Sequence, residues 1–465
     1  MRKLTTIFLL LALATPALAA PPNTAKLRKG IEAVLAVDEV AHSKVGIYVA
    51  DVRTGEELYS LNADELFNPA SNTKLVTSAT ALDHFGPSFT WTTRLSYEGK
   101  LQSGGVDAIW LKSDGDPFLV YEDVMRFALA AKREGLREVK GDVIVDDTSF
   151  APGYMPPGYD QKDEDASYRA PIGAVSVNFN AIAVTVKAGK DGVEVELYPP
   201  NDYIIVKNSA KLTKGKRQRI SVRSVTDGDR TRIEVTGTLG ADASALEVRK
   251  RIDHPGLYAA SVLRQAMVDV GIKINGTFKV GVRPDKTTTL MVESSEPLAW
   301  SISGMNKWSN NFIAEQLFRL LGAADDAPAN NEKAHEVIEA TMKKLGVADG
   351  WKIMNGSGLY DGNLFSPRQL GTLLVAMAEH RFGPEFEASL SIAGSDGTLA
   401  GRLKTKDLRG KTGTLNSVSA LSGYATTASG RHVSYVILFN DTPVRAWTLR
   451  DEQDKMAQAI TDWSE

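Results

Sequence analysis

The strand-rich segments at its two ends constrain the fold of this chain most. Near the start, residues 45–62 contain two runs of β-forming side chains around a turn at Thr54–Gly55. Near the end, residues 417–427 and 432–440 form two more runs, which Ser429–Gly430 joins. If the two ends meet, these runs make one antiparallel sheet. The long middle of the chain would then be an insertion into that unit.

Helical patterns lie beside these strands. Apolar residues with helical spacing occupy residues 71–84, 299–322 and 331–346. Residues 443–465 have an amphipathic helical pattern, with Pro443 near the expected first turn. Strands and helices together predict an α+β fold, in which an antiparallel sheet is flanked by helices.

The middle of the chain has a different pattern. From about residue 90 to 285, short β-rich runs alternate with turn dipeptides, and one helical pattern interrupts them at 121–135. A length of 465 residues favours two or three domains. The basic run at 211–223, KLTKGKRQRISVR, is typical of an exposed strand edge, where lysines discourage aggregation.

The first residues are typical of a cleavable export signal. MRK is basic, a short apolar run follows, and Ala17–Ala19 offers the small residues that a signal peptidase needs. We expect cleavage after Ala19 and export to the periplasm. Because no other long apolar run follows, we expect no membrane anchor. Loss of Arg2 and Lys3 with the leader changes the formal net charge from −3 to −5, so nothing favours nucleic acid as a partner.

Several kinds of chemistry are excluded by residue content. The chain has no cysteine, which excludes disulfides, thiolate metal sites and a catalytic cysteine. None of the six histidines has a metal-ligand spacing such as H-E-x-x-H, and no G-x-S-x-G elbow indicates a serine–histidine hydrolase. We therefore expect neither a metal nor a cofactor.

Ser71 and Lys74, within NPASNTKLVTS, stand three residues apart at a predicted helix start. In the plain interpretation, Ser71 is the helix N-cap. In the chemical interpretation, Lys74 lies on the same helix face and takes the proton of the Ser71 hydroxyl. Lysine can do so only when neutral, with a pKa lowered by burial and by a second cation. The pair alone does not decide between the two.

Ser309-Asn310-Asn311 is a second candidate motif. By itself it is weak, because polar residues beside a helix are ordinary. In the chemical interpretation, Ser309 passes a proton to the leaving amine, while Asn311 orients the substrate amide and Lys74.

Lys411-Thr412-Gly413-Thr414 is the third motif. A P-loop would need a glycine where Thr405 stands, so a phosphate loop is excluded. We expect a strand instead, on which Gly413 lets a substrate backbone approach closely. The lysine would be the second cation, and its side chain with the two threonines can bind a carboxylate.

The three motifs together are far more specific than each alone. They follow the order serine-x-x-lysine, serine-x-asparagine, lysine-threonine-glycine of β-lactamases and penicillin-binding proteins. Ser309 follows Ser71 by 238 residues, far more than a β-lactamase needs. With these motifs and this gap, the chain resembles the D-alanyl-D-alanine carboxypeptidase/endopeptidase family of class C low-molecular-mass penicillin-binding proteins (penicillin-binding protein 4-like, peptidase family S13). In that family, extra domains are inserted between the first and second motifs.

The resemblance extends over nearly the whole mature chain. It includes SDGDPFL at 113–119, GDVIVDDTSFA at 141–151, APIGAVSVNFNAIAV at 170–184, NGSGLYDGNLFSP at 355–367 and GSDGTLAGR at 394–402. It implies a β-lactamase/transpeptidase-like domain made of residues 20–92 and 286–465. The inserted β-rich region would form domain II from 93–187 and 250–285, and domain III from 188–249.

The resemblance also implies a role for each motif residue. Ser71 would be the acylated nucleophile and Lys74 its base, with Ser309 and Asn311 completing the proton network. Lys411 would contribute charge, Thr412 and Thr414 would hold the terminal carboxylate of the substrate beside Gly413, and the backbone amides of Ser71 and Thr414 would form the oxyanion hole.

The stretch DEDASYRAP corresponds to the family's grip on the peptide stem. It points to Asp163 and Tyr168 as substrate-binding residues, although it also fits an acidic surface loop. One departure from the family is Asp361, which stands where an arginine is often seen. If that arginine binds substrate, the reversed charge changes substrate preference or rate.

We therefore expect a serine-type D-Ala-D-Ala carboxypeptidase and/or DD-endopeptidase. It would cleave peptidoglycan peptide stems and crosslinks through a Ser71 acyl-enzyme, and β-lactams would acylate the same serine. A β-lactamase is an alternative, but it must deacylate the drug fast, and the long insertion argues against it. A non-catalytic cell-wall-binding relative would keep the fold and lose Lys74 and Lys411, which are present. An esterase or D-amino-acid amidase has no support in the sequence, and the oligomeric state stays open.

Overall fold

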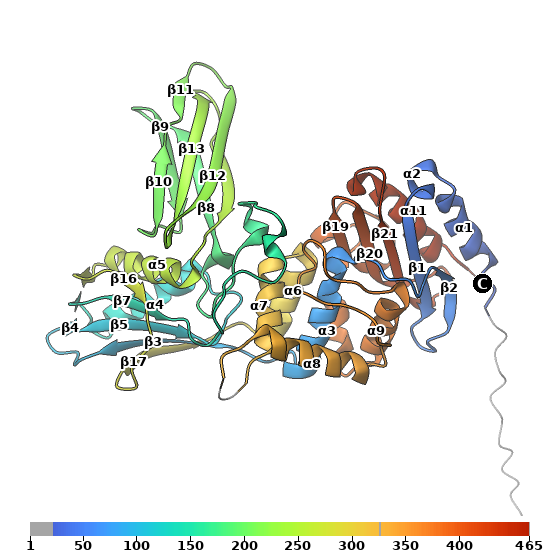
Figure 1. The fold of residues 1–465 in the computed structure, drawn as a ribbon, viewed down its shortest axis with the longest axis horizontal. Helices are drawn as coiled ribbons and strands as arrows, with labels where there is room; N and C mark the ends of the chain where they lie inside the picture. Colours follow the sequence, from blue (N-terminus) through green and yellow to red (C-terminus); the bar gives the residue numbers. More distant parts are fainter. Residues whose placement is uncertain (1–21, 325–326, 465) are drawn as a thin grey trace, which may run out of the picture.

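Strands from both ends of the chain form one six-stranded antiparallel sheet in the computed structural model, which describes residues 22–324 and 327–464. The strand order is β18-β19-β20-β21-β1-β2. β1 (Lys44–Asp51) pairs with β2 (Glu57–Leu61) on one side and with β21 (His432–Asn440) along its whole length. The other strands are β18 (Ser391–Ile392), β19 (Leu408–Leu415) and β20 (Val418–Thr426). The expected meeting of the ends is confirmed (Figure 1).

Both faces of this sheet are buried under helices, because alternate side chains of its strands enter two different cores. In β1, Ile47 and Val49 join the core under α1 (Ala25–Leu35) and α11 (Arg450–Thr461). Tyr48 and Ala50 point the other way, into the larger core. That core is built with α3 (Thr73–Phe85), α6 (Leu298–Trp308), α7 (Asn311–Leu321), α8 (Asn331–Lys344) and α9 (Pro367–Glu379). We call this sheet and its helices the split unit; two short helices, α2 (Asp38–Ala41) and α10 (Gly383–Ala388), complete it.

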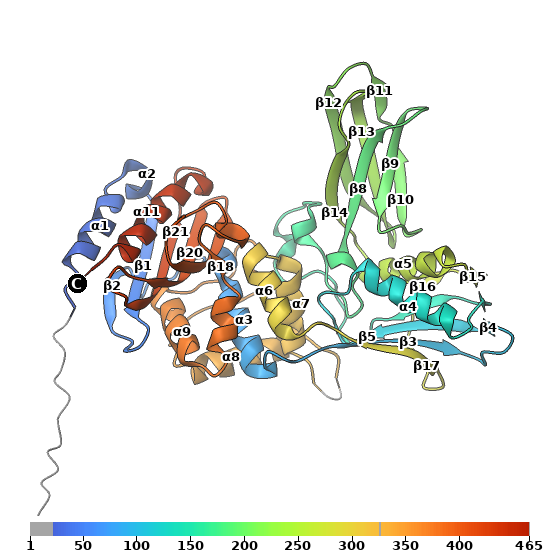
Figure 2. The ribbon, with the colours of Figure 1, turned by 180° about the vertical axis from the view of Figure 1, so that it is seen from behind.

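The second unit is a five-stranded sheet in the order β16-β7-β5-β3-β17 (Figure 2). Its strands are β3 (Thr92–Glu98), β5 (Ala108–Ser113), β7 (Val143–Asp146), β16 (Phe278–Val280) and β17 (Thr288–Ser294). Two helices, α4 (Tyr121–Arg133) and α5 (Pro255–Asp269), share its core. Short strands β4 (Gly105–Val106), β6 (Glu138–Val139) and β15 (Lys273–Ile274) form a small sheet beside it.

The prediction of a single helix in this region is wrong, because α5 is a second one. Its apolar residues cover nearly all sides of the helix, so they give no amphipathic pattern. The start of α5 did carry a signal, since Pro255 occupies the first turn and the His254 ring accepts a hydrogen bond from the Leu257 N–H.

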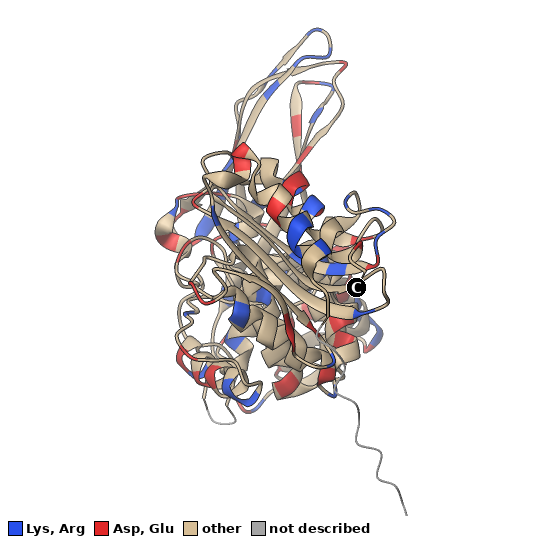
Figure 3. Cartoon of the chain, turned by 90° about the vertical axis from the view of Figure 1, so that its right-hand side faces the viewer, with Lys and Arg blue, Asp and Glu red and all other residues tan. Residues whose placement is uncertain are grey.

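Residues 181–251 form a β-rich arm that projects from the rest of the molecule (Figures 1 and 2). One sheet contains β8 (Ala181–Ala188), β9 (Val193–Tyr198) and β14 (Leu246–Arg251). The other contains β10 (Ile204–Asn208), β11 (Lys211–Thr213), β12 (Gln218–Asp227) and β13 (Arg230–Gly240). Within the described residues β12 pairs with β13 alone, so the basic run lies at a sheet edge, and Lys and Arg occur along the arm (Figure 3).

Strand pairing divides the chain at slightly different places from those expected. β17 lies beyond the expected boundary at residue 285, yet it pairs with β3 and so belongs to the second unit. The arm begins at Ala181, whereas domain III was expected from residue 188, because β8 pairs with β9 and β14 of the arm.

Near the carboxyl end, the helix does not begin around Pro443. A short 3-10 turn occupies Ala446–Leu449, and α11 follows from Arg450. The predicted leader and its cleavage after Ala19 lie outside the described residues. None of the helices in residues 22–324 and 327–464 combines the length and hydrophobicity needed to cross a bilayer.

Candidate active site

Ser71 lies in a 3-10 turn, Ala70–Asn72, directly before α3. It does not cap the helix, since Asn72 holds the N-cap position and no side chain bonds there. The Ser71 Oγ lies instead 3.1 Å from Lys74 Nζ. The preceding residue, Ala70, has a positive φ of 45°, an unfavourable conformation for a residue with a Cβ. Such local strain is typical of functional sites.

Lys74 is completely buried, and its amine has two fixed acceptors. Nζ donates to Asn311 Oδ1 at 2.7 Å and to the Ser357 carbonyl at 2.7 Å. Burial lowers the pKa of Lys74 to about 7, against the opposing charge of Glu315. A neutral amine has two N–H groups and one lone pair. The two acceptors use both N–H groups, which leaves the lone pair for the Ser71 hydroxyl.

Ser309 and Asn311 lie where two helices meet. The sequence pattern of one long helical segment breaks there into α6 and α7, because Ser309 adopts the left-handed conformation with φ 55°. The Asn310 side chain then caps α7 by accepting from the Ile313 N–H. Asn311 also donates from Nδ2 to the Tyr168 carbonyl at 3.0 Å.

Lys411 connects the third motif to the second. It is completely buried on β19, and Nζ donates to Ser309 Oγ at 2.9 Å and to the Thr412 carbonyl at 2.7 Å. Burial, reinforced by the charge of nearby Lys74, lowers the pKa of Lys411 well below its ordinary value. The structure thus brings these residues together as two neighbouring hydrogen-bonded groups. One is Ser71, Lys74 and Asn311, and the other is Ser309 and Lys411.

Gly413 brings β19 against the turn that carries Ser71. A Cβ at this position would lie 3.0 Å from the Pro69 carbonyl oxygen and 3.0 Å from the Ser71 nitrogen. At Gly413, strand β19 therefore lies against the Ser71 turn, whereas the sequence analysis expected a substrate backbone to approach this glycine. Thr412 Oγ1 donates to Thr398 Oγ1, and Thr414 is exposed at the groove.

A groove of about 770 Å³ opens over this set of residues. We call it the main groove; Ser71, Tyr168, Ser309, Asn311 and Thr414 line its centre. Its other lining residues include Lys162, Glu164, Tyr360, Asn416 and Trp447. A volume of this size suits a peptide of a few residues.

Of the two predicted stem-binding residues, only Tyr168 lines the main groove. Asp163 is exposed and lines a neighbouring hollow. The carboxylate that reaches the main groove is Glu164, whose Oε2 accepts from the hydroxyls of Tyr168 and Tyr360. Asp361 does not line this groove, and its side chain accepts from Asn68 Nδ2 at 3.0 Å.

Glu315 is a buried acid beside the site that the motifs did not indicate. Its carboxylate accepts from the N–H groups of Ser357 at 2.8 Å and Gly356 at 3.2 Å. It thereby fixes the loop whose Ser357 carbonyl bonds Lys74. Burial raises the pKa of Glu315, while these donors and Lys74 favour the ionised form. Its position, four residues after Asn311 on α7, was the available signal.

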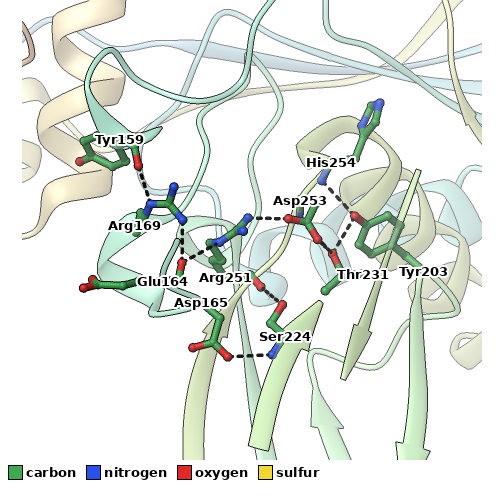
Figure 4. Close-up of polar contacts among 10 residues, drawn as sticks. All are labelled: Tyr159, Glu164, Asp165, Arg169, Tyr203, Ser224, Thr231, Arg251, Asp253 and His254. Carbon is green, nitrogen blue, oxygen red and sulfur yellow. Dashed lines mark hydrogen bonds and ion pairs between the residues drawn. The ribbon is translucent and has the colours of Figure 1, made fainter. Parts of the chain in front are cut away.

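The segment that carries Glu164 and Tyr168 is held by the arm (Figure 4). Arg251, at the end of β14, donates from Nε to the Glu164 carbonyl at 3.2 Å. Asp165 accepts from the Ser224 N–H at 2.9 Å and pairs with Lys250 at 2.8 Å. Further hydrogen bonds extend this network at both of its ends, and they involve Arg169, Thr231, Tyr203, Asp253 and His254. One wall of the main groove therefore depends on the inserted strands.

Comparison with known proteins agrees with this geometry. Residues 27–462 match the family described as the D-Ala-D-Ala carboxypeptidase 3 (S13) family, which is most of the 465-residue chain. The chain belongs to the S13 family. The resemblance stated from the motifs is thereby confirmed.

Relatives of this S13 chain include proteins of known structure. A D-alanyl-D-alanine carboxypeptidase from an Actinomadura species is 31% identical over 443 residues, covering 90% of this chain and 82% of the relative. Penicillin binding protein 4 from Haemophilus influenzae superposes with a TM-score of 0.78 at 22% identity, covering 94% and 98% of the two chains. A predatory peptidoglycan endopeptidase from Bdellovibrio bacteriovorus gives 0.52 at 17% identity, covering 90% and 93%. The predicted transpeptidase-like fold of this S13 protein is confirmed.

Proposed function

We propose that this S13 protein is an exported serine-type D-Ala-D-Ala carboxypeptidase and DD-endopeptidase that acts on peptidoglycan peptide stems and crosslinks. One observation supports this most: the buried Lys74 amine, with a pKa lowered to about 7, lies 3.1 Å from Ser71 Oγ. The family supplies the reaction class. The same fold occurs in a protein described as a peptidoglycan endopeptidase, so it is compatible with crosslinks as well as free stems.

In the first step, the neutral Lys74 amine takes the Ser71 proton while Oγ attacks the carbonyl carbon of the penultimate D-alanine. The negative charge that develops on the carbonyl oxygen is stabilised by the backbone N–H groups of Ser71 and Thr414. When the C–N bond breaks, the proton that Lys74 took from Ser71 passes through Ser309 to the departing amine. Lys74 is then neutral again, and the acyl group remains on Ser71 as an ester. Lys411 lies on this path, because its Nζ donates a hydrogen bond to Ser309 Oγ.

In the second step, a water molecule attacks the ester carbonyl carbon. Lys74 takes the proton of the water and returns it to Ser71 Oγ as the C–O bond breaks. The serine hydroxyl and the neutral amine are regenerated, and the shortened stem is released as a carboxylic acid. Asn311, which bonds Lys74 Nζ, keeps the amine in place and offers an amide to the substrate backbone.

Substrate is held from two sides. Thr412 and Thr414, next to Gly413 on β19, bind the terminal carboxylate of the stem. On the opposite wall, Tyr168 and Glu164 bind the stem, a role for which Asp163 was the sequence-based candidate. β-Lactams acylate Ser71, because their strained amide presents the same carbonyl and their acyl product leaves slowly.

A labelling and hydrolysis experiment tests this function. Purified wild-type protein is incubated with a fluorescent penicillin, with a pentapeptide-stem muropeptide and with a crosslinked dimer. We expect stable labelling, D-alanine release and dimer cleavage, all of which Ser71→Ala abolishes. Ser429→Ala, which removes a hydroxyl from a distant turn, serves as the matched control and keeps all three.

Other outcomes would contradict the proposal. Rapid turnover of the penicillin would indicate a β-lactamase. Muropeptide binding with no labelling and no product would indicate a cell-wall-binding protein without catalysis.

A further inference from the structure

A second groove, of about 300 Å³, begins at the wall of the main groove. We call it the side groove. Its lining includes Tyr168, Phe179, Tyr198, Arg249 and Trp308. Tyr168, Ser309 and Asn311 line both grooves, so the two adjoin at the proposed proton donor. The side groove runs from there onto β8, β9 and β14 of the arm.

Three exposed aromatic rings border the side groove. Tyr198 is 45% exposed, Tyr168 50% and Trp308 70%. The hydroxyl of Tyr198 donates to Glu122, and that of Tyr168 donates to Glu164, each at 2.5 Å. These bonds hold the phenol ends in place, and the Tyr198 ring is also in edge-on contact with Tyr121. About half of each tyrosine stays exposed. A cluster of large exposed rings beside a catalytic set is typical of a binding surface.

Strained backbone lies at the side groove, where Asn178 and Phe179 form part of the lining. Asn178, Phe179 and Asn180 have consecutive positive φ angles of 51°, 59° and 50°. The Phe179 ring is fixed there by edge-on contacts with Phe118 and Phe312. Non-glycine residues rarely adopt this conformation, and clusters of such strain occur at ligand sites.

Arg249 adds a charge to this surface. It is exposed on β14, and in the part of the chain that the structure describes, its guanidinium has no hydrogen-bond or ion-pair partner. Guanidinium groups bind carboxylates through two parallel hydrogen bonds. The side groove thus combines apolar ring faces with one available cation, which suits an acidic peptide.

We propose that the side groove binds the second peptide stem of a crosslinked substrate, with Arg249 paired to a carboxylate of that stem. This inference rests on the function proposed above. There, Ser309 hands a proton to the leaving amine, and Ser309 lies on the wall that the two grooves share. The leaving half of the substrate therefore lies at this wall. A free stem releases one D-alanine, whereas a crosslink releases a whole peptide, which needs a path away from Ser309.

The position of the groove favours peptide over glycan. An extended peptide spans about 3.3–3.6 Å per residue, so sugars at the far end of a stem lie several residues away from the scissile bond. A groove that starts at Ser309 meets the leaving peptide first. In both substrates Ser71 attacks the carbonyl carbon of a D-alanine, and only the leaving amine differs. The side groove therefore changes substrate choice and adds no chemical step.

The test compares two substrates in three proteins. kcat and KM are measured for a crosslinked muropeptide dimer and for a pentapeptide-stem monomer, using wild type, Arg249→Gln and Arg219→Gln. Arg219, exposed on the edge strand β12 and outside the side groove, gives a matched loss of charge on the arm. For Arg249→Gln we expect KM for the dimer to rise about tenfold, with kcat for the dimer and both constants for the monomer within about twofold of wild type. Arg219→Gln should match wild type on both substrates.

A binding measurement removes the dependence on turnover. Calorimetric titration of Ser71→Ala with the dimer should give a Kd about tenfold tighter than that of Ser71→Ala combined with Arg249→Gln. The monomer should bind both proteins equally. Tyr198→Ser in the same background should also weaken only the dimer.

The outcomes separate this inference from the proposed function. If wild type labels with penicillin and cleaves both substrates, but Arg249→Gln treats them as wild type does, only the side-groove inference fails. Equal losses on dimer and monomer, or an Arg249-dependent affinity for peptide-free glycan, also overturn it. Absence of labelling and of D-alanine release in wild type would instead overturn the proposed function and this inference with it.

Discussion

At the scale of single residues, the proposed role of Lys74 as the base predicts how the acylation rate depends on pH. An ordinary lysine, with a pKa near 10.4, has roughly one neutral amine in a few thousand at pH 7. With a pKa of about 7, half of the Lys74 amines are neutral at that pH. We therefore expect the acylation rate with fluorescent penicillin to fall about tenfold for each pH unit below about 6 and to level off above about 8. Stopped-flow labelling between pH 5 and 9 checks this, and a pH-independent rate would contradict it.

Glu315→Gln tests whether Glu315 acts on Lys74 through its negative charge or through the loop that it holds in place. The negative charge of Glu315 raises the pKa of Lys74, so its removal lowers that pKa and moves the acid limb of the labelling profile to lower pH. The amide leaves one of the N–H groups of Gly356 and Ser357 poorly matched, so we also expect a stability loss of about 1–3 kcal/mol by thermal unfolding.

Glu339→Gln is the matched control for this variant, because Glu339 is exposed on α8. It should leave the profile and the melting temperature unchanged. If Glu315→Gln leaves the low-pH part of the labelling profile unchanged, Glu315 acts only by positioning the loop that contains Gly356 and Ser357.

Individual site residues differed in how well the sequence indicated them. The three motifs predicted that Ser71, Lys74, Ser309 and Lys411 converge. These side chains lie in two neighbouring hydrogen-bonded pairs, and their catalytic roles stay predictions. The motifs could not indicate Ser357, because it contributes a backbone carbonyl that any residue type supplies.

At the scale of elements, the approach of β19 to the Ser71 turn should control reactivity. In Gly413→Ala, the new Cβ would press on the Pro69 carbonyl and the Ser71 nitrogen, each at 3.0 Å. The neighbouring backbone must shift by a few tenths of an ångström. Displacements of this kind misalign reacting groups, so we expect penicillin acylation to slow by about 10- to 100-fold.

Gly401→Ala is the control for this element, because nothing lies within 4 Å of the Cβ it would add. It should label at the wild-type rate. Wild-type labelling in Gly413→Ala would show that the turn absorbs the added methyl group without moving Ser71.

The sequence predicted elements well where their patterns were periodic. β1, β2, β20 and β21 follow from runs of β-forming side chains, and α8 follows from helical spacing. The break between α6 and α7 was not predictable from spacing, since apolar periodicity continues across Ser309. α5 was missed for the opposite reason, because it is apolar on nearly all sides.

At the scale of the whole molecule, the arm is expected to act on the site through the segment in Figure 4. Asp165→Ala removes the bond to the Ser224 N–H and the pair with Lys250. We expect KM for the pentapeptide stem to rise about three- to tenfold, with faster hydrogen exchange across residues 163–168, because two contacts of roughly 1 kcal/mol each no longer hold the segment.

Asp227→Ala gives the comparison, since it breaks the ion pair with Arg232 elsewhere on the arm. It should leave KM and the exchange of 163–168 unchanged. If Asp165→Ala also leaves both unchanged, the arm does not position this wall of the main groove.

Domain organisation was predictable in outline only. The change in pattern after residue 90 indicated an insertion, but strand pairing decides where it ends. β17 returns to pair with β3, and no local signal in residues 286–294 shows which sheet receives it. Long-range pairing of this kind depends on the partner strand rather than on the segment itself.

The pairing of β1 with β21 has a consequence for biogenesis. The Asn68 N–H donates to Asn440 Oδ1, 372 positions further along, and β1 completes its hydrogen bonding only with β21. If the polypeptide crosses the inner membrane from its amino end, as its leader predicts, the segments bearing Lys411 and β21 emerge last. On the function proposed above, a partly threaded chain would therefore lack Lys411 and the strand that completes the hydrogen bonding of β1. Such a chain would gain its reactivity only after most of it has crossed the membrane.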